Sequence, residues 1–417
     1  MASSKHSSSP PGRSNLPVTY AAIVASRLAL SLTDLSNTLK HSQQLSSPLT
    51  SYSNLQEGIY LFNHDIDPYS GGTFRHSPLL LALFATILPN SRLAASVLWT
   101  ANDAIGAWAL VQTFRARQNV TSSSRDALVA AMYLLNPYNF LSSLALSTSS
   151  FESTLMLLSI MFAAQHKSSA ALLALSFLVH LSPPAVVLLL PIILLLINNP
   201  LSHLASPQPQ PMKLKQVAPL FGQFAAYFFA LVVASTLVCG NWEWIYQTWG
   251  ATLTLPDLTP TTGLWWYFFT EMFDHFRPFF LMVFTVHLLI YVVPISTKFQ
   301  HDPLYATFIL LGILATFKGY TTLSDPGLFL SMISIFPEVY SYFRHPIVTA
   351  LLHLHSALLM PLFHHLWLAQ GTGNANFYYA TTLVFAIANG FAVVDCIWAG
   401  LRIAIGPNVE PYVVTQE

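Results

Sequence analysis

Apolar runs long enough to cross a lipid bilayer recur along almost the whole chain. A spanning helix needs about 20 consecutive, mostly apolar residues, and we count roughly twelve candidate spans. Composition supports this interpretation, because only 8% of the 417 residues are charged, whereas soluble domains carry about 25%. The sequence therefore predicts an all-α, polytopic membrane protein.

The candidate spans fill most of the chain between two polar tails. They lie near residues 17–35, 91–114, 126–147, 150–165, 169–181, 183–198, 217–239, 264–297, 303–318, 326–343, 346–369 and 377–402. A shorter apolar run, 78–88, falls below the spanning length, so we expect it to be re-entrant or interfacial. We divide the chain into a flexible tail (1–16), a single transmembrane domain (17–402) and a second tail (403–417).

The positively charged residues predict an orientation for this domain. When the spans alternate across the membrane, most Lys and Arg residues outside them fall on one side, which identifies that side as cytoplasmic. Both tails and a Pro-rich linker, 199–216, then face the cytoplasm. Three polar segments face the lumen or the exterior, namely 36–90, 240–263 and 370–376. We expect the functional surface of the protein on this non-cytoplasmic face.

Two residues bear directly on this orientation. Lys318 is the one clear exception to the bias, because it falls on the side that is poor in positive charge. Asn119 begins a glycosylation sequon, Asn-Val-Thr, in a loop predicted to be cytoplasmic. We therefore expect Asn119 to carry no glycan.

The segment 263–277 combines seven aromatic side chains, Trp266 among them, with a Glu, an Asp, a His and an Arg. It directly precedes a long apolar run. Ionisable residues are costly to remove from water, so four of them at the mouth of a span suggest a functional role. If the segment is helical, Glu271, Asp274 and His275 share one face. The alternative is an aromatic belt at the membrane interface with a few solvated charges.

The predicted luminal loop 370–379 is a second candidate site. Its two glycines make the backbone permissive, and the amides of Asn374 and Asn376 offer paired hydrogen-bond donors and acceptors. Phe377 and the two tyrosines after it add aromatic rings beside these amides. Uncharged amides beside aromatic rings suit a sugar or phosphoinositol headgroup at the membrane surface. The alternative is that Asn374 or Asn376 simply caps the last helix, and both roles can hold together.

The first predicted luminal loop contains two carboxylates, Asp65 and Asp67, separated by one residue. In a glycosyltransferase that uses a lipid-linked sugar, such a residue acts as the base on the acceptor hydroxyl or helps to bind a metal. The alternative is a solvated Asx turn before Pro68.

Other kinds of chemistry find little support in the sequence. A net charge of zero, from 17 basic and 17 acidic residues, argues against nucleic acid as a partner. Two cysteines form neither a disulfide framework nor a metal motif. Four histidines of the penultimate span are spaced poorly for metal binding and fit interfacial positions better; they are His353, His355, His364 and His365. No Ser/His/Asp or Cys/His triad and no nucleotide-binding loop is visible, so we expect neither cofactor nor metal.

Several ionisable residues lie within or at the ends of apolar segments. Such residues usually face the interior of a helix bundle and find partners there. The sequence does not pair them; they are Arg27, Asp103, Glu152, Asp325 and Asp395.

Three segments together resemble one known family. They read PYSGGTFRHSPLL at 68–80, GLWWYFFTEMFDHFR at 263–277 and NANFYYATTLVF at 374–385. In this order they are similar to the U subunit of the glycosylphosphatidylinositol (GPI) transamidase complex. Weaker likenesses occur at 257–260, 317–320 and 365–367. The resemblance covers the chain from about Arg27 to Arg402.

This resemblance implies a non-catalytic subunit in the endoplasmic reticulum membrane, with a transmembrane bundle similar to that of GT-C glycosyltransferases. The complex of that family cleaves a C-terminal signal from a protein and attaches a preformed GPI anchor. Its nucleophile belongs to a separate, caspase-like cysteine peptidase subunit. The U subunit is implied to help recognise the GPI glycolipid, and by resemblance this role falls to Asn374, Asn376, Phe377, Trp266, Glu271 and His275.

Two other functions remain open at this point. One is an active GT-C mannosyltransferase that takes its sugar from a polyprenyl phosphate, with Asp65 or Asp67 as the acidic residue. The other is a transporter or lipid flippase, which the intramembrane charges allow. No internal repeat is evident in the sequence, although repeats are common in transporters.

Overall fold

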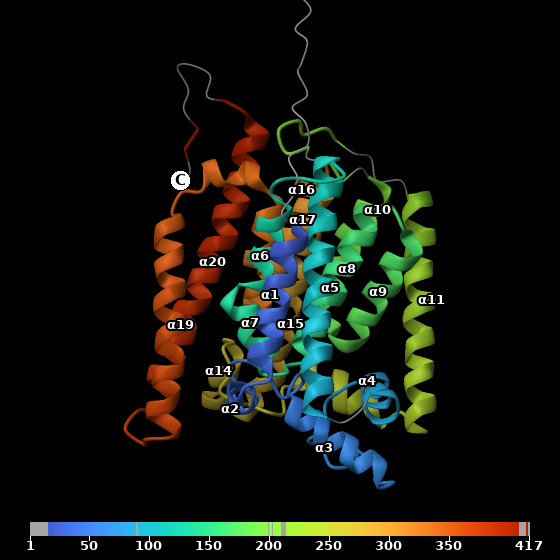
Figure 1. Cartoon of the computed structure of the whole chain (residues 1–417), viewed down its shortest axis with the longest axis vertical. Helices are drawn as coiled ribbons and strands as arrows, with labels where there is room; N and C mark the ends of the chain where they lie inside the picture. The colour runs from blue at the N-terminus through green and yellow to red at the C-terminus, as the bar shows by residue number, and fades with distance from the viewer. Residues whose placement is uncertain are drawn as a thin grey trace, which may run out of the picture.

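The computed structural model describes residues 16–88, 91–198, 200–201, 203–209, 214–407 and 414–415. These residues form a bundle of helices (Figure 1) and include no β-strand. The prediction of an all-α membrane bundle is therefore confirmed.

The first half of the chain contains both long helices and short helical elements. They are α1 (Leu16–Ser31), α2 (Asp34–Leu39), α3 (Tyr52–Asn63), α4 (Pro78–Ala82), η1 (Leu83–Ile87), α5 (Arg92–Gln118), α6 (Asp126–Leu134), α7 (Pro137–Leu144), α8 (Ser149–Ala164), α9 (Ser168–Leu181), η2 (Pro183–Leu188) and α10 (Leu189–Ile197). Here η marks a 3₁₀ or π helix.

The second half contains the longest apolar helices. Its elements are α11 (Leu214–Cys239), α12 (Glu243–Ile245), η3 (Tyr246–Gly250), α13 (Ala251–Thr254), α14 (Trp265–Glu271), η4 (Asp274–Phe276), α15 (Arg277–Ile290), α16 (Val292–Lys298), α17 (Pro303–Phe317), α18 (Ser324–Met332), η5 (Ile333–Ile335), η6 (Pro337–Tyr342), α19 (Pro346–Leu368) and α20 (Ala375–Ile405).

The number of spans differs from the sequence-based expectation of about twelve. Among the described residues, four helical stretches are long and apolar enough to cross a membrane, and six apolar helices are shorter. The four long stretches are Lys215–Cys239, Asp274–Lys298, Pro346–Leu368 and Ala375–Ile405. A count of twelve full spans is therefore not confirmed, although a polytopic protein is.

Two segments expected to be single spans are broken by proline. The 126–147 segment divides into α6 and α7 at Pro137, where the side chain of Asn136 accepts a hydrogen bond from the backbone N–H of Tyr138 at 3.0 Å. The 326–343 segment divides into α18 and two 3₁₀ turns, the second of which begins at Pro337. Proline has no N–H to donate and its ring clashes with the preceding turn, so it disfavours the interior of a helix and favours a break at these two positions.

The two ends of the bundle differ in character (Figure 1). Elements α2, α3, α4 and α14 gather at one end, together with the turn that joins α19 to α20. We call this the loop end. The start of α1 and the end of α20 lie at the opposite end, which we call the tail end. The three polar segments expected to face the lumen thus converge at the loop end.

A partly buried ion pair holds part of the loop end together. Nε of Arg75, in the first loop, donates to a carboxylate oxygen of Asp257 at 2.9 Å. The guanidinium also donates to the backbone and side chain of Gln247. These contacts join segments that are far apart in the sequence.

The buried charges of the bundle have partners. Arg27 pairs with Asp103 between α1 and α5. Arg117, at the end of α5, makes two parallel hydrogen bonds to Asp302, at 2.9 and 2.8 Å, and a third to Glu338 at 2.7 Å. Because an unpaired buried charge is costly, these pairs explain how polar residues fit into apolar segments.

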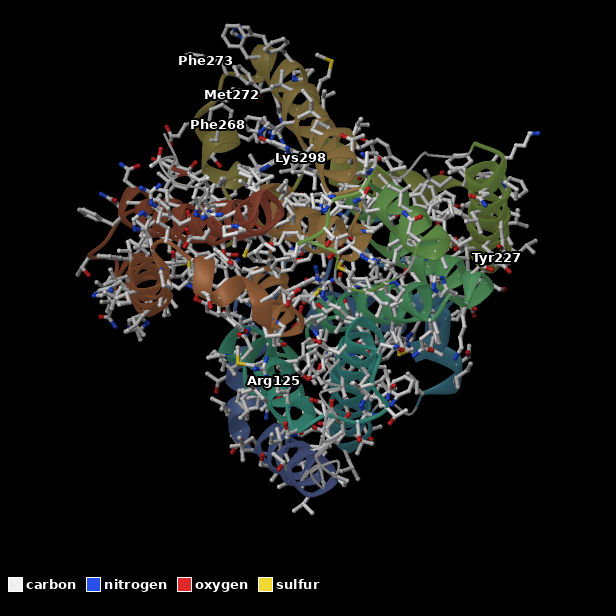
Figure 2. All side chains as sticks on the ribbon, turned by 90° about the horizontal axis from the view of Figure 1, so that it is seen from above. Arg125, Tyr227, Phe268, Met272, Phe273 and Lys298 are labelled. Carbon is white, nitrogen blue, oxygen red and sulfur yellow. The ribbon has the colours of Figure 1, made fainter. Side chains whose placement is uncertain are left out.

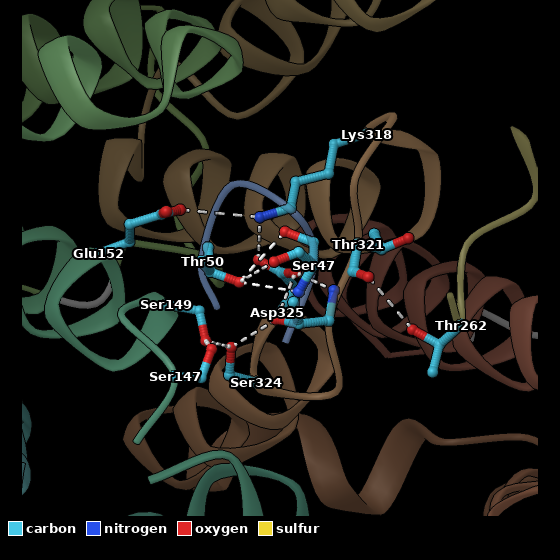
Figure 3. Close-up of polar contacts among 11 residues, drawn as sticks. Ser47, Thr50, Ser147, Ser149, Glu152, Thr262, Lys318, Thr321, Ser324 and Asp325 are labelled. Carbon is cyan, nitrogen blue, oxygen red and sulfur yellow. Dashed lines mark hydrogen bonds and ion pairs between the residues drawn. The ribbon is translucent and has the colours of Figure 1, made fainter. Parts of the chain in front are cut away.

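Lys318 also lies inside the bundle (Figure 3). Its ammonium group contacts Asp325 at 2.5 Å and Glu152 at 3.8 Å. A neighbouring chain of hydroxyl groups links Ser324 to Ser149 at 2.8 Å, and Ser149 to Ser147 at 2.8 Å. These ion pairs and hydroxyl contacts join α8 and α18 to the connection after α17.

Candidate functional site

The aromatic segment 263–277 does not form one helix. Helix α14 ends at Glu271, Met272 is extended, and Asp274 begins a separate 3₁₀ turn. Glu271, Asp274 and His275 would share one face only in a continuous helix, and this condition is not met. One reason is Pro278, which lacks the N–H that a continuous helix would use to bond the carbonyl of Asp274.

Some side chains of this segment are buried in the bundle, and others are exposed. Trp265, Trp266 and Phe269 are buried, each at most 5% exposed. Glu271 and His275 are exposed. Figure 2 shows Phe268, Met272 and Phe273 at the outer edge of the molecule. The segment therefore has an anchored half in α14 and a half that points away from the bundle.

Trp266 is the centre of an aromatic cluster that joins α14, α19 and α20. Its ring is stacked on Trp367 with centroids 6.1 Å apart, and it contacts Tyr378 and Tyr379 at 5.8 Å each. The indole N–H of Trp266 is buried and has no hydrogen-bond partner. A buried donor without a partner is rare and is a point at which a ligand or water can bind.

The Asn374 turn lies against this cluster. The side chain of Asn374 accepts a hydrogen bond from the backbone N–H of Phe377 at 3.2 Å, so Asn374 is the N-cap of α20, as one of the two interpretations expected. The phenol of Tyr267 donates to the side-chain oxygen of Asn376. Phe377 is 55% exposed and is stacked on Phe363 with centroids 5.9 Å apart.

The structure thus groups most of the candidate lipid-binding residues, but not all of them. Asn374, Asn376 and Phe377 lie near Trp266 at the loop end. Glu271 ends α14, one helical turn after Tyr267. Desolvation, together with the Glu271 carboxylate, raises the pKa of the Tyr267 phenol.

His275 stands apart from this group. Its ring contacts Phe276 at 4.0 Å and Phe273 at 6.0 Å, on the exposed half of the segment. Sequence reasoning also missed Trp367 as the partner of Trp266 and Tyr267 as the partner of Asn376. Both are contacts between distant parts of the chain, and no local pattern encodes them.

Of the acidic pair in the first loop, Asp67 has a structural role and Asp65 does not. The carboxylate of Asp67 accepts a hydrogen bond from the backbone N–H of Tyr69 at 2.9 Å, which is an Asx turn, and another from Asn241 at 3.2 Å. Asp65 is exposed. Within the part of the chain that the structure describes, no group of three or more His, Cys, Asp or Glu residues could hold a metal ion.

A large apolar cavity lies between the α19–α20 pair and helices α6, α7 and α18. Its volume is about 850 Å³, and its lining includes Met132, Tyr138, His353 and Asp395. Tyr138 also belongs to the cluster around Trp266, so the cavity begins where that cluster ends.

Comparison with known proteins places the chain in a family. The family model of GPI transamidase subunit PIG-U matches residues 21–385. The chain belongs to this family. It is 32% identical over 385 residues to GPI transamidase component GAB1 of Saccharomyces cerevisiae, an alignment that covers 91% of this chain and 93% of the yeast protein.

Relatives from other organisms place the chain in the same family. GPI-anchor transamidase component PIGU of Homo sapiens is 29% identical over 413 residues, covering 91% of this chain and 92% of the human protein. The GAB1 homolog of Schizosaccharomyces pombe is 32% identical over 366 residues, covering 86% and 87% respectively. The resemblance seen in the sequence is confirmed.

Proposed function

We propose that this subunit of the GPI transamidase recognises the GPI lipid at the loop end of its bundle and takes no covalent part in the reaction. The observation that carries this proposal is the grouping of Trp266, Tyr267, Asn374, Asn376 and Phe377 on one surface. A GPI lipid has a glycan and phosphoinositol head above hydrocarbon chains. The grouped residues offer amides for the head and aromatic rings for the boundary between head and chains.

The hydrogen-bond donors of this surface suit the hydroxyl and phosphate oxygens of a glycolipid head better than a metal ion. Asn374 uses its oxygen to cap α20, which leaves its NH₂ group to donate. Asn376 accepts from Tyr267, which likewise leaves its NH₂ group to donate. The unsatisfied indole N–H of Trp266 is a further donor nearby. Sugar hydroxyls and phosphate oxygens are acceptors for all three groups.

A non-catalytic role is supported by the state of the two cysteines. Cys396 is buried in α20, and Cys239 is partly buried at the end of α11. A reactive cysteine needs an accessible thiol next to groups that favour its thiolate form, and burial in apolar surroundings opposes this. We infer that cleavage and transfer belong to another subunit, a caspase-like cysteine peptidase, and that the complex resides in the endoplasmic reticulum membrane.

The mannosyltransferase alternative loses its main support. Asp67 is engaged in an Asx turn, and Asp65 is an exposed turn residue with a positive φ of 57°. Neither carboxylate is part of a group that could bind a metal among the described residues.

The proposal is tested by separating the capping role of Asn374 from a binding role. Serine caps helices about as well as asparagine, so Asn374→Ser keeps the cap and removes the amide, whereas Asn374→Lys removes both and adds a charge. We expect both variants to lower the surface level of GPI-anchored reporter proteins, with Asn374→Lys the more severe. Abundance of the subunit and recovery of its partner subunits are measured in the same cells.

Ser91→Asn is a matched control, because Ser91 is exposed and is the N-cap of α5, where its side chain accepts from the backbone N–H of Ala94 at 3.2 Å. It should leave reporter levels unchanged. Normal reporter levels in both Asn374 variants, at normal abundance, would contradict lipid recognition at this surface.

A further inference from the structure

Glu271 places a carboxylate at the edge of the proposed GPI surface. It ends α14, one helical turn after Tyr267, so the two side chains lie on the same face of that helix. Desolvation and the Glu271 carboxylate both raise the pKa of the Tyr267 phenol, and the second effect requires the carboxylate to lie close to the phenol. The same phenol donates to the side-chain oxygen of Asn376. Glu271 therefore adjoins a residue that we assign to the glycolipid head.

Among the described residues, no cation pairs with this carboxylate. Glu271 is exposed and takes part in none of the ion pairs that the described residues form. Arg277, the nearest arginine or lysine along the chain, donates to the backbone carbonyls of Thr254, at 3.2 Å, and Leu255. The ring of His275 packs against two phenylalanines of the exposed half of the segment. The carboxylate is thus open to a cation from outside the chain.

The groups beside Glu271 have the opposite hydrogen-bonding capacity. The NH₂ groups of Asn374 and Asn376 remain free to donate, because their oxygens accept within the protein. The indole N–H of Trp266 is a further donor without a partner. An ionised carboxylate, in contrast, only accepts. A ligand complementary to the whole surface therefore carries acceptor oxygens in one part and a cationic donor in another.

The head of a GPI lipid carries both kinds of group. Its inositol bears a phosphate, and the sugar attached to the inositol is a glucosamine with a free primary amine. Phosphoethanolamine groups further along the glycan carry primary amines as well. A carboxylate beside such an amine favours its protonated form. Phosphatidylinositol, and glycans whose amines are acetylated, offer no such cation.

The position of Glu271 brings it within reach of the first part of the glycan. Glu271 lies four residues after Tyr267, which corresponds to about 6 Å along the axis of α14. Tyr267 itself contacts Asn376. A single sugar ring spans a comparable distance. An inositol held by the amides would thus have its neighbouring sugar beside the carboxylate.

We propose that Glu271 binds a primary ammonium group of the GPI head and so selects lipids whose glycan carries a free amine. The amides and the indole hold hydroxyl and phosphate oxygens, while the carboxylate accepts from the ammonium group. A lipid without this amine meets the same donors but leaves the carboxylate unpaired. This selectivity rests on the proposed function, because it belongs to the same surface.

Photo-crosslinking with matched probes tests the proposal on the intact complex. Three GPI analogues carry the same diazirine near the inositol: one has free amines, one is acetylated at the glucosamine and one at the phosphoethanolamine. The complex is held in phosphatidylcholine nanodiscs, which contain no other primary amine. Adducts on residues 264–272 and 363–379 are measured against probe concentration. We expect acetylation of the recognised amine to weaken binding about five-fold, as for one partly solvated charge-assisted contact.

Glu271→Gln separates the charge of the amine from the bulk of the acetyl group. It removes the carboxylate at nearly constant size, so it should weaken binding of the free-amine probe about five-fold and leave binding of the acetylated probe almost unchanged. Asp274→Asn is the matched control. It removes another exposed carboxylate of the same segment, in the half that points away from the bundle, and should keep the preference.

Selectivity and lipid binding give different results in this assay. A preference for either free amine that disappears in Glu271→Gln supports the proposal, and the acetylated probe that binds weakly identifies which amine is recognised. Equal binding of all three probes, a preference that survives Glu271→Gln, or an equal loss in Asp274→Asn would overturn it. Adducts on both segments would in those cases leave the proposed function standing. An absence of adducts on both segments with every probe would contradict the proposed function as well.

Discussion

The ammonium nitrogen of Lys318 lies 2.5 Å from a carboxylate oxygen of Asp325, and this pair is inside the bundle. Lys318 is only 6% exposed, and Glu152 approaches it from α8 at 3.8 Å. This pairing explains why Lys318 does not follow the charge bias of the other basic residues. The bias reflects cations in loops that stay on one side of the membrane, and a neutralised cation in the interior carries no such information.

Removing this ammonium group should destabilise the subunit strongly. Lys318→Met leaves Glu152 and Asp325 buried without a cation, and breaking a buried pair in this way costs about 3–5 kcal/mol. We expect low abundance and a lower melting temperature of the purified complex. The double variant Lys318→Met with Asp325→Asn should recover part of the loss, and a single variant of normal stability would contradict the assigned pairing.

Arg117 should not tolerate replacement by lysine. Its guanidinium makes parallel hydrogen bonds to Asp302 and a further one to Glu338. A lysine ammonium lacks the planar fork that this geometry requires. Arg117→Lys should cost about 2 kcal/mol through lost charge-assisted hydrogen bonds. Thermal unfolding measures this cost, and Arg125→Lys, at an exposed position, should cost almost nothing.

His76 should make the loop end sensitive to acid. Its ring is buried, which lowers its pKa from 6.5 to about 4, against the opposing effect of a hydrogen bond to the carbonyl of Ser51. Because the pKa is lower in the folded state, the neutral ring stabilises the fold fully above pH 6.5. That contribution, about 3 kcal/mol at most, is lost as the pH falls from 6.5 towards 4.

The acid sensitivity is checked by following the melting temperature of the complex as the pH is lowered. His76→Gln should flatten this dependence, whereas His345→Gln, at an exposed position, should not. An unchanged pH dependence in His76→Gln would show that other groups cause it.

The orientation of the bundle predicts the fate of the sequon at Asn119. Asn119 is exposed and ends α5 in a left-handed conformation, so a glycan would fit there sterically. It lies at the tail end, which we expect to face the cytoplasm, where no glycan is added. Digestion with a glycosidase should leave the electrophoretic mobility of the subunit unchanged. A shift that disappears in Asn119→Gln would reverse the orientation.

The sequence predicted best the elements that depend on local pattern. Helices α8, α9, α17, α19 and α20 begin and end within a few residues of the expected limits, because each is an uninterrupted apolar run. The cap at Asn374 was foreseen for the same reason, since asparagine before a helix is a local signal.

The sequence predicted least where contacts between distant segments decide the structure. The stacking of Trp266 on Trp367 and the pairing of Lys318 with Glu152 join residues about a hundred or more positions apart. Whether the aromatic segment is one helix, which would place its charges on one face, was left open by the sequence. The burial of Trp265 and Phe269 and the proline at 278 produce two short elements in its place.

Direct capture of the lipid is the most decisive test of GPI recognition at the loop end. The intact complex would be illuminated with a GPI analogue that carries a diazirine near its inositol, and the modified peptides would be identified by mass spectrometry. The proposal predicts adducts in residues 264–272 and 363–379 of this subunit, reduced in Asn374→Ser. Adducts confined to other subunits, or to the tail end of this one, would contradict it.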